Sequence, residues 1–291
     1  MKKIVLILML LASVGYVQYS QKALANTDST CSVKCVEPYD LTSSTSRFFS
    51  SVTGQNFLAE KIGASLLKKA IKKNIESGTI KTNLQSYSVR DLKAGRFKSI
   101  EITGKNVNAQ GVYISSFDLK TLCNFNYIVD NKKGDVIIKE NMPMSLKVEI
   151  SEDDLNRTML SSDYKRIISD VNSLAGGFFE INSTQVRLKD NKMYYVLKYN
   201  MPFVRKSKEI ALCANLRIDN GKIALADTSF VGSGTTLDIN KFSKLLNYIN
   251  PLDFSAKILE NKDAKVNIKN VKIVDKKITM DGVVTVLKDK E

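Results

Sequence analysis

The sequence predicts an α+β protein, built as a bent antiparallel meander of β-hairpins with one long N-terminal helix and two shorter helices. Three observations carry this prediction. Apolar residues recur at helical spacing from about Arg47 to Glu76, whereas apolar and polar residues mostly alternate over residues 80–150. In the C-terminal half, three segments read as strand, polar turn and strand, the pattern of an antiparallel hairpin. They are residues 186–193, 216–223 and 271–278.

The first 25 residues have the organisation of a secretory signal peptide. Lys2 and Lys3 precede an apolar run over residues 4–17, and residues 23–25 (Ala-Leu-Ala) offer a small-x-small cleavage site. We therefore expect an exported protein, in the periplasm or on the outer face of the cytoplasmic membrane. No second apolar run of the sequence reaches the ~18–20 residues that a membrane-spanning helix needs.

A lead-in rich in serine and threonine, residues 26–54, precedes the folded domain, which we expect to occupy residues 55–291. The domain opens with the long helix, from Gln55 to about Glu76, and Gly78 ends it. Two adjoining apolar rows of this helix contain Leu58, Ile62, Leu66, Leu67 and Ile71. Its far side carries a stripe of lysines, which suits the C-terminal end of the helix dipole. They are Lys68, Lys69, Lys72 and Lys73.

Most of the remaining chain is expected to be strand. Alternation of apolar and polar residues predicts strands at residues 80–84, 97–103, 111–122, 136–138 and 144–150. In the last hairpin the apolar parity shifts between Ile268 and Val271. This shift predicts a β-bulge near Lys269 and Asn270, a device that bends a sheet.

Two shorter helices are expected to interrupt the strands. Ser151 followed by Asp154 is a capping-box-like start, and the helical pattern that follows runs to Leu174. A third helix is predicted over residues 235–250, with Pro251 as its stop. Its apolar row contains Phe242, Leu245, Leu246 and Ile249.

Composition favours binding over catalysis. The chain has no histidine, which excludes Ser-His-Asp triads, Cys-His pairs and histidine-containing zinc sites, and we expect no metal and no cofactor. The formal net charge of +14 favours anionic partners, and outside the cytoplasm little nucleic acid is available as such a partner. Anionic lipid headgroups or acidic envelope polymers are its natural partners, and simple solubility is the alternative explanation.

Two groups of residues suggest other chemistry, and both have a simpler explanation. Ser65 with Lys68, and Ser162 with Lys165, match the S-x-x-K element of serine enzymes that act on cell walls, but no K-T-G accompanies them. Three adjacent acids, residues 152–154, could bind calcium, yet the helix dipole alone favours acids in a first turn. We predict that the chain is not an enzyme, with a histidine-free wall hydrolase as a third hypothesis.

Four cysteines, all beyond the signal, favour disulfide bonds in an oxidising compartment. They are Cys31, Cys35, Cys123 and Cys213, for which three pairings are open. We favour Cys31 with Cys35 as a local loop, and Cys123 with Cys213 as a staple between two strands. The reason is that the second pair lies in apolar-alternating segments.

Three runs of the sequence carry a likeness to a known family. They are residues 95–107 (GRFKSIEITGKNV), 111–122 (GVYISSFDLKTL) and 146–156 (LKVEISEDDLN). Together they resemble the LmeA-like family of exported bacterial phospholipid-binding proteins. The hairpins at residues 216–223 and 271–286 fall where that family places similar ones, and none of these runs contains a catalytic motif.

The resemblance implies both a fold and a function. The fold would be a strongly curved antiparallel sheet wrapped on the long helix and the two shorter ones, similar to tubular lipid-binding folds. An apolar groove would bind phospholipid or a similar amphiphile, and the protein would act as a carrier, sensor or chaperone for envelope assembly. The predicted groove residues are Leu58, Ile62, Leu66, Leu67, Ile71, Leu245, Leu246 and Ile249.

The lysines of the long helix would also have a role in this hypothesis. The lysine stripe, Lys68, Lys69, Lys72 and Lys73, would meet the lipid headgroup or an anionic membrane surface. An amphipathic helix ordinarily packs on a core, so the alternative is a structural or interaction module of the envelope without a ligand. The sequence identifies no protein partner.

Overall fold

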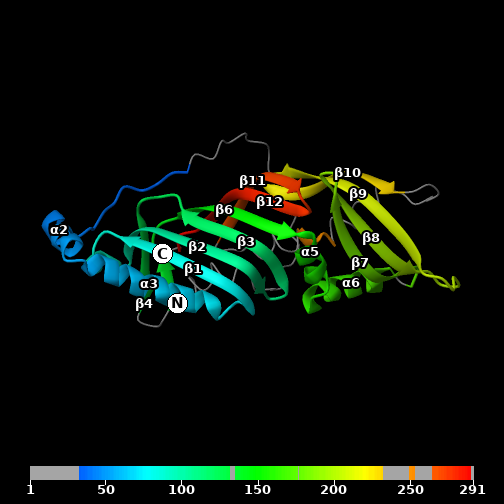
Figure 1. Ribbon diagram of the computed structural model, residues 1–291, viewed down its shortest axis with the longest axis horizontal. Coiled ribbons are helices and arrows are strands. Elements are labelled where there is room, and N and C mark those ends of the chain that lie inside the picture. The colour runs from blue at the N-terminus through cyan, green and yellow to red at the C-terminus, as the bar shows by residue number, and fades with distance from the viewer. Residues whose placement is uncertain (1–32, 132–134, 176, 232–248, 253–263, 290–291) are drawn as a thin grey trace.

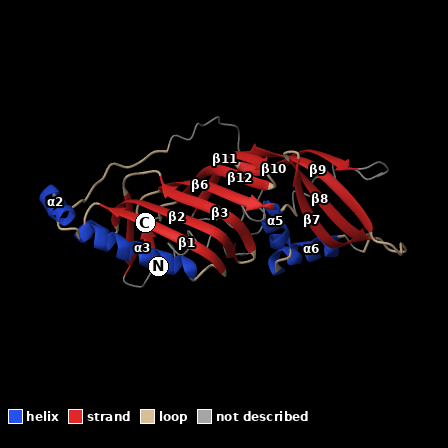
Figure 2. Cartoon of the chain, viewed as in Figure 1, coloured by secondary structure: helices blue, strands red, loops and turns tan. Residues whose placement is uncertain are grey.

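The computed structural model describes residues 33–131, 135–175, 177–231, 249–252 and 264–289. The molecule is elongated, and two antiparallel sheets follow one another along its long axis (Figure 1). Strands form its body, whereas the helices lie along one side and at one end (Figure 2). The predicted α+β class with antiparallel sheets is confirmed.

The first sheet has the strand order β11-β12-β6-β3-β2-β4-β5, and β1 also pairs with β2. The bounds of its strands are β1 (Ser77–Ser86), β2 (Arg96–Ala109), β3 (Val112–Thr121), β4 (Asn126–Asn131), β5 (Asp135–Ile138), β6 (Met142–Ser151), β11 (Ala264–Val274) and β12 (Lys277–Val286). Strand β12 pairs with β6, from Lys277 opposite Ser151 to Val286 opposite Met142. The C-terminal hairpin thereby joins strands from the first half of the chain.

The second sheet is a four-stranded meander, in the order β10-β9-β8-β7. Its strands are β7 (Glu180–Lys189), β8 (Lys192–Asn200), β9 (Lys208–Asp219) and β10 (Lys222–Val231). The single meander expected from the sequence is therefore divided between two sheets. The sheets meet at β11, where the Ile268 N–H donates a hydrogen bond to the Gly221 carbonyl (2.8 Å).

The predicted bulge lies in β11. Its pairing register with β12 shifts between Ile268 and Asn270. The shift brings Val271 back to the side of the strand that carries Ile268. It confirms the bulge predicted from the change in the alternation of apolar residues.

Five helices are described: α2 (Ser44–Val52), α3 (Gln55–Lys72), α4 (Val89–Lys93), α5 (Glu152–Met159) and α6 (Ser162–Leu174). The long helix α3 begins at Gln55 as predicted, and Ser151 and Asp154 form the predicted capping box of α5. The expected second helix is in fact two helices. Ser161 starts the new one, because its side chain accepts a hydrogen bond from the Tyr164 N–H as the N-cap of α6.

Helix α2 lies inside the predicted lead-in, residues 26–54, within which the helical spacing of apolar residues begins at about Arg47. Ser43 caps it by accepting a hydrogen bond from the Ser46 N–H. The predicted signal and most of the predicted third helix, residues 235–250, lie outside the described residues. Within the described ranges, no helix has both the length and the apolar character to span a membrane.

Candidate functional site

The buried face of the first sheet carries three rows of mostly apolar residues, which we call the apolar rows. Each row contains one residue from each of β1, β2, β3, β6, β12 and β11. The few residues of the rows that are not apolar are glycines or threonines. Because neighbouring strands lie ~4.8 Å apart, a row across six strands is about 24 Å long. The rows are Ile80-Gly104-Phe117-Val148-Met280-Val271, Thr82-Ile102-Leu119-Leu146-Gly282-Ile268 and Leu84-Ile100-Thr121-Met144-Val284-Val266.

Two glycines allow close contacts within the apolar rows. A Cβ atom on Gly104 would lie 2.2 Å from Cε1 of the Phe117 ring, so the ring occupies the space over this glycine. A Cβ atom on Gly282 would lie 2.3 Å from the Asn267 carbonyl oxygen, next to the bulge of β11. A side chain at either position would displace its neighbour.

Helix α3 packs on β1, at the edge of the apolar rows. Gly63 permits the close approach, because a Cβ atom there would lie 2.6 Å from Cδ2 of Leu84. The Thr82 hydroxyl donates a hydrogen bond to the Ala64 carbonyl (2.8 Å). The helix is therefore fixed against the sheet by both an apolar and a polar contact.

The five predicted groove residues of α3 do not share one face. Ile71 is fully buried and Leu67 packs against the core, whereas Leu58, Ile62 and Leu66 point outward with more than half of their surface exposed. The prediction that all five line one groove is therefore wrong. An i, i+4 row turns by about 40° around a helix at each step, so a row that starts outward reaches the packed side only near its end.

The lysine stripe lies on the same outward side, not opposite the exposed apolar residues as predicted. Lys69, Lys72 and Lys73 are exposed, and Lys68 is half-buried. Eleven residues make close to three helical turns, so Lys69 lies almost in line with Leu58 along the helix. The outward side of α3 is thus apolar toward its start and cationic toward its end.

Ile249 is fully buried, and it packs with α6 and the second sheet. Its carbonyl accepts a hydrogen bond from the Tyr164 hydroxyl (2.6 Å), which is also hydrogen-bonded to the Tyr195 hydroxyl. Since each hydroxyl has one proton, Tyr195 is the donor to Tyr164. Burial raises the pKa of both tyrosines well above the ordinary value, so both stay neutral. The other predicted residues of that row, Leu245 and Leu246, lie outside the described residues.

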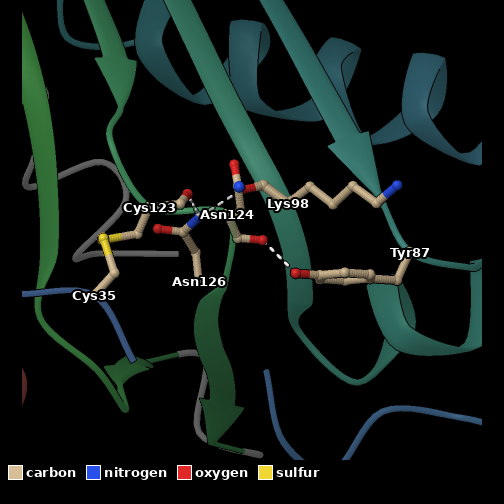
Figure 3. Close-up of a disulfide and its surroundings, with 6 residues drawn as sticks. All are labelled: Cys35, Tyr87, Lys98, Cys123, Asn124 and Asn126. Carbon is tan, nitrogen blue, oxygen red and sulfur yellow. Dashed lines mark hydrogen bonds between the residues drawn. A yellow bond between two sulfur atoms is a disulfide. The ribbon is translucent and has the colours of Figure 1, made fainter. Parts of the chain in front are cut away.

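The disulfide bond joins Cys35 to Cys123, which ties the lead-in to the segment between β3 and β4 (Figure 3). The Asn126 side chain supports this segment by donating hydrogen bonds to the carbonyls of Cys123 (3.1 Å) and Lys98 (2.8 Å). Both pairings that we favoured, Cys31 with Cys35 and Cys123 with Cys213, are therefore wrong. Cys213 is a buried free thiol on β9 of the second sheet, and Cys31 lies outside the described residues.

A buried carboxylate also fixes the lead-in. Asp91 accepts hydrogen bonds from the Ser88 hydroxyl (2.6 Å), the Thr42 N–H (2.9 Å) and the Thr42 hydroxyl (2.8 Å). Burial alone would raise the pKa of Asp91, but these hydrogen bonds and the nearby Arg96 guanidinium outweigh it and hold the pKa below its usual value. The ionised carboxylate thus joins residue 42 to the start of α4.

The acids at the start of α5 have structural roles. Asp154 accepts hydrogen bonds from the Ser151 N–H (3.0 Å) and from the Ser115 hydroxyl, and Glu152 accepts one from the Leu188 N–H (2.7 Å). Among the described residues, no group of three or more cysteines and acids is placed to hold a metal ion.

One open cleft of about 580 Å³ lies between the β2–β3 turn and the start of α6. The Arg157 guanidinium lies 4.0 Å from the centroid of the Tyr113 ring at its wall. Its lining is mostly polar and includes Glu76, Gln110, Tyr113, Arg157, Ser161 and Asp163. Such a lining is unsuited to an acyl chain, which leaves the apolar rows as the better candidate for contact with lipid.

Comparison with known proteins gives one match. Residues 54–283 match the model of a family described as LmeA-like phospholipid-binding. No curated protein and no solved structure matches the chain. The matched residues include all the strands of both sheets except the last residues of β12.

Proposed function

The chain belongs to the LmeA-like phospholipid-binding family, and from this membership we propose that it binds phospholipid or a similar amphiphile along the apolar rows. One observation carries the proposal: the rows form a continuous apolar surface across six paired strands. Residues two apart on a strand are separated by ~6.8 Å, so three rows form a surface about 14 Å wide and about 24 Å long. That size suits acyl chains.

The chemistry of the rows supports affinity without a catalytic group. Burial of an acyl chain contributes about 0.8 kcal/mol per methylene, so ten to fourteen buried carbons give roughly 8–11 kcal/mol. In this proposal the lysines of α3 meet the headgroup phosphates or an anionic membrane surface. They are Lys68, Lys69, Lys72 and Lys73.

We further propose that the protein works outside the cytoplasm, as a carrier, sensor or chaperone for envelope assembly. The disulfide between Cys35 and Cys123 supports this location, because such bonds persist in oxidising compartments. The signal-like residues at the N-terminus agree with it.

Lipid extraction followed by mass spectrometry tests the proposal on the purified protein. We expect about one phospholipid per chain, and uptake of a fluorescent fatty acyl probe that unlabelled phospholipid displaces. A phospholipid with a diazirine in its acyl chain locates the site: we expect cross-links to β2, β3 and β6, and none to β9 or β10. Protein that is repeatedly free of lipid and takes up no probe would refute lipid binding and favour the structural module.

A further inference from the structure

One end of the molecule carries large apolar side chains that no other part of the described chain covers. Helix α2 has no buried residue, and Figure 1 shows it at this end, beyond the start of α3. Monomeric proteins rarely expose contiguous apolar surface of this kind without a partner. On α2 and the outward side of α3, these side chains are between 54 % and 65 % exposed, and they include Phe48, Phe49, Phe57, Leu58, Ile62 and Leu66.

The two helices of this region are strongly cationic. Residues 44–73 contain six lysines and arginines and one acid, Glu60. The Glu60 carboxylate faces the sheet, where it accepts hydrogen bonds from the Ser86 N–H (2.6 Å) and the Ser86 hydroxyl (2.9 Å). The Lys61 ammonium, by contrast, lies 4.2 Å from the centroid of the exposed Phe57 ring. A cation thus lies among the exposed apolar groups near the start of α3, four lysines follow toward its end, and the carboxylate of the one acid is hydrogen-bonded to Ser86.

A cleft of about 520 Å³ lies beside these side chains, and its lining includes Arg47, Phe57, Glu60, Tyr87 and Lys98. Nε of Arg47 is buried and has no hydrogen-bond partner among the described residues. A buried guanidinium N–H without an acceptor is unfavourable. A phosphate oxygen would supply the missing acceptor.

We propose that α2 and the outward side of α3 form a docking face for an anionic lipid bilayer. The exposed apolar side chains enter the region between headgroups and acyl chains, while Arg47 and the lysines meet headgroup phosphates. The occupant is a membrane because the face combines bulky apolar groups with a large excess of positive charge, as interfacial helices do. This docking goes beyond lipid held along the apolar rows and does not depend on it.

Fluorescence tests the docking, since the chain contains no tryptophan. Phe48→Trp places a single reporter on the docking face. Phe178→Trp places a second one on an exposed phenylalanine between α6 and β7, in a segment that contains no lysine or arginine. With vesicles of equal phosphatidylglycerol and phosphatidylcholine, we expect the emission of the first variant to shift to shorter wavelength and that of the second to stay unchanged.

Co-sedimentation with the same vesicles tests the residues. Phe48→Ser with Phe49→Ser should lower the partition coefficient about tenfold or more, because each phenylalanine contributes apolar burial at the interface. Lys72→Gln with Lys73→Gln should lower it and flatten its dependence on salt. Lys189→Gln with Lys192→Gln, two equally exposed lysines of the β7–β8 hairpin, should leave it unchanged. All these side chains are exposed, so circular dichroism should show the wild-type fold.

Three results would overturn the docking face. The first is equal sedimentation with pure phosphatidylcholine vesicles, and the second is an equal spectral shift at position 178. The third is a dimer seen by light scattering that Phe48→Ser with Phe49→Ser dissociates, because the face would then join two copies of the chain. Uptake of the acyl probe is measured separately and should persist in the variant with Phe48→Ser and Phe49→Ser, so failure of docking and failure of lipid binding are distinguishable.

Discussion

Replacing both Cys35 and Cys123 by serine should strongly destabilise the protein. The disulfide joins residues 88 positions apart, and a cross-link over a loop of this length restricts the unfolded chain by about 4–5 kcal/mol in the chain-entropy model. Domains of ordinary size have unfolding free energies of about 5–15 kcal/mol. The double variant should therefore lose a large fraction of its stability, although Asp91 still holds Thr42.

Urea titrations followed by far-ultraviolet circular dichroism measure this loss. We expect the double variant to unfold at a clearly lower urea concentration than the wild type. Cys213→Ser is the matched control, because it replaces a buried thiol that forms no cross-link and should produce a much smaller shift. An unchanged unfolding free energy in the double variant would refute the loop-closure argument. A peptide that links Cys123 to Cys213 in a non-reducing digest would refute the pairing itself.

Three further predictions concern buried contacts. Tyr164→Phe removes the hydrogen bond to the Ile249 carbonyl and should lower the free energy of unfolding by about 1–3 kcal/mol in urea titrations; an equal stability would mean that the bond is absent. The pKa of Asp91 lies below the unfolded value of ~3.9, so its stabilisation is complete above about pH 4 and is lost as the pH falls through the lower folded value. Asp91→Asn should therefore flatten the fall of the melting temperature between pH 5 and pH 2, and an identical slope would contradict this role. Gly104→Ala brings a methyl group against the Phe117 ring and should cost about 1–3 kcal/mol, whereas a neutral effect would show that the apolar rows pack loosely.

Features that depend on neighbouring residues could be predicted from the sequence. The start of α3 at Gln55, the capping box of Ser151 and Asp154, and the bulge after Ile268 each follow from a local pattern. The parity shift at the bulge was informative because a strand has a side-chain period of two, and one extra residue reverses every following side chain.

Features that depend on distant pairing could not be predicted. Any strand with an apolar side could have paired with β6, and nothing local to β12 selects it, so the apolar rows emerge only from the assembled sheet. The cysteine pairing was wrong for the same reason: Cys123 follows β3 of the first sheet, whereas Cys213 lies on β9 of the second.

Helix α2 could have been found, but its signal is weak. Ser43 is a good N-cap, and the apolar residues that follow it recur at helical spacing. The surrounding serines and threonines are typical of a loop, and they dominated the prediction. The outward side of α3 was misassigned because a row of i, i+4 residues was treated as one straight face.

The pairing of β12 with β6 has a consequence for the order in which the protein can assemble. Strands β7 to β10, which form a separate sheet, lie between β6 and β12 in the sequence. Strand β6 therefore cannot pair with β12 until nearly the whole chain is present. During synthesis from the N-terminus, the chain therefore presents ten residues of open backbone along one edge of β6, from Met142 to Ser151, while the second sheet is still emerging. An unpaired edge with apolar side chains is a template for pairing with other chains. Truncations that end before Lys277 should accordingly aggregate, whereas the complete C-terminal hairpin closes the edge.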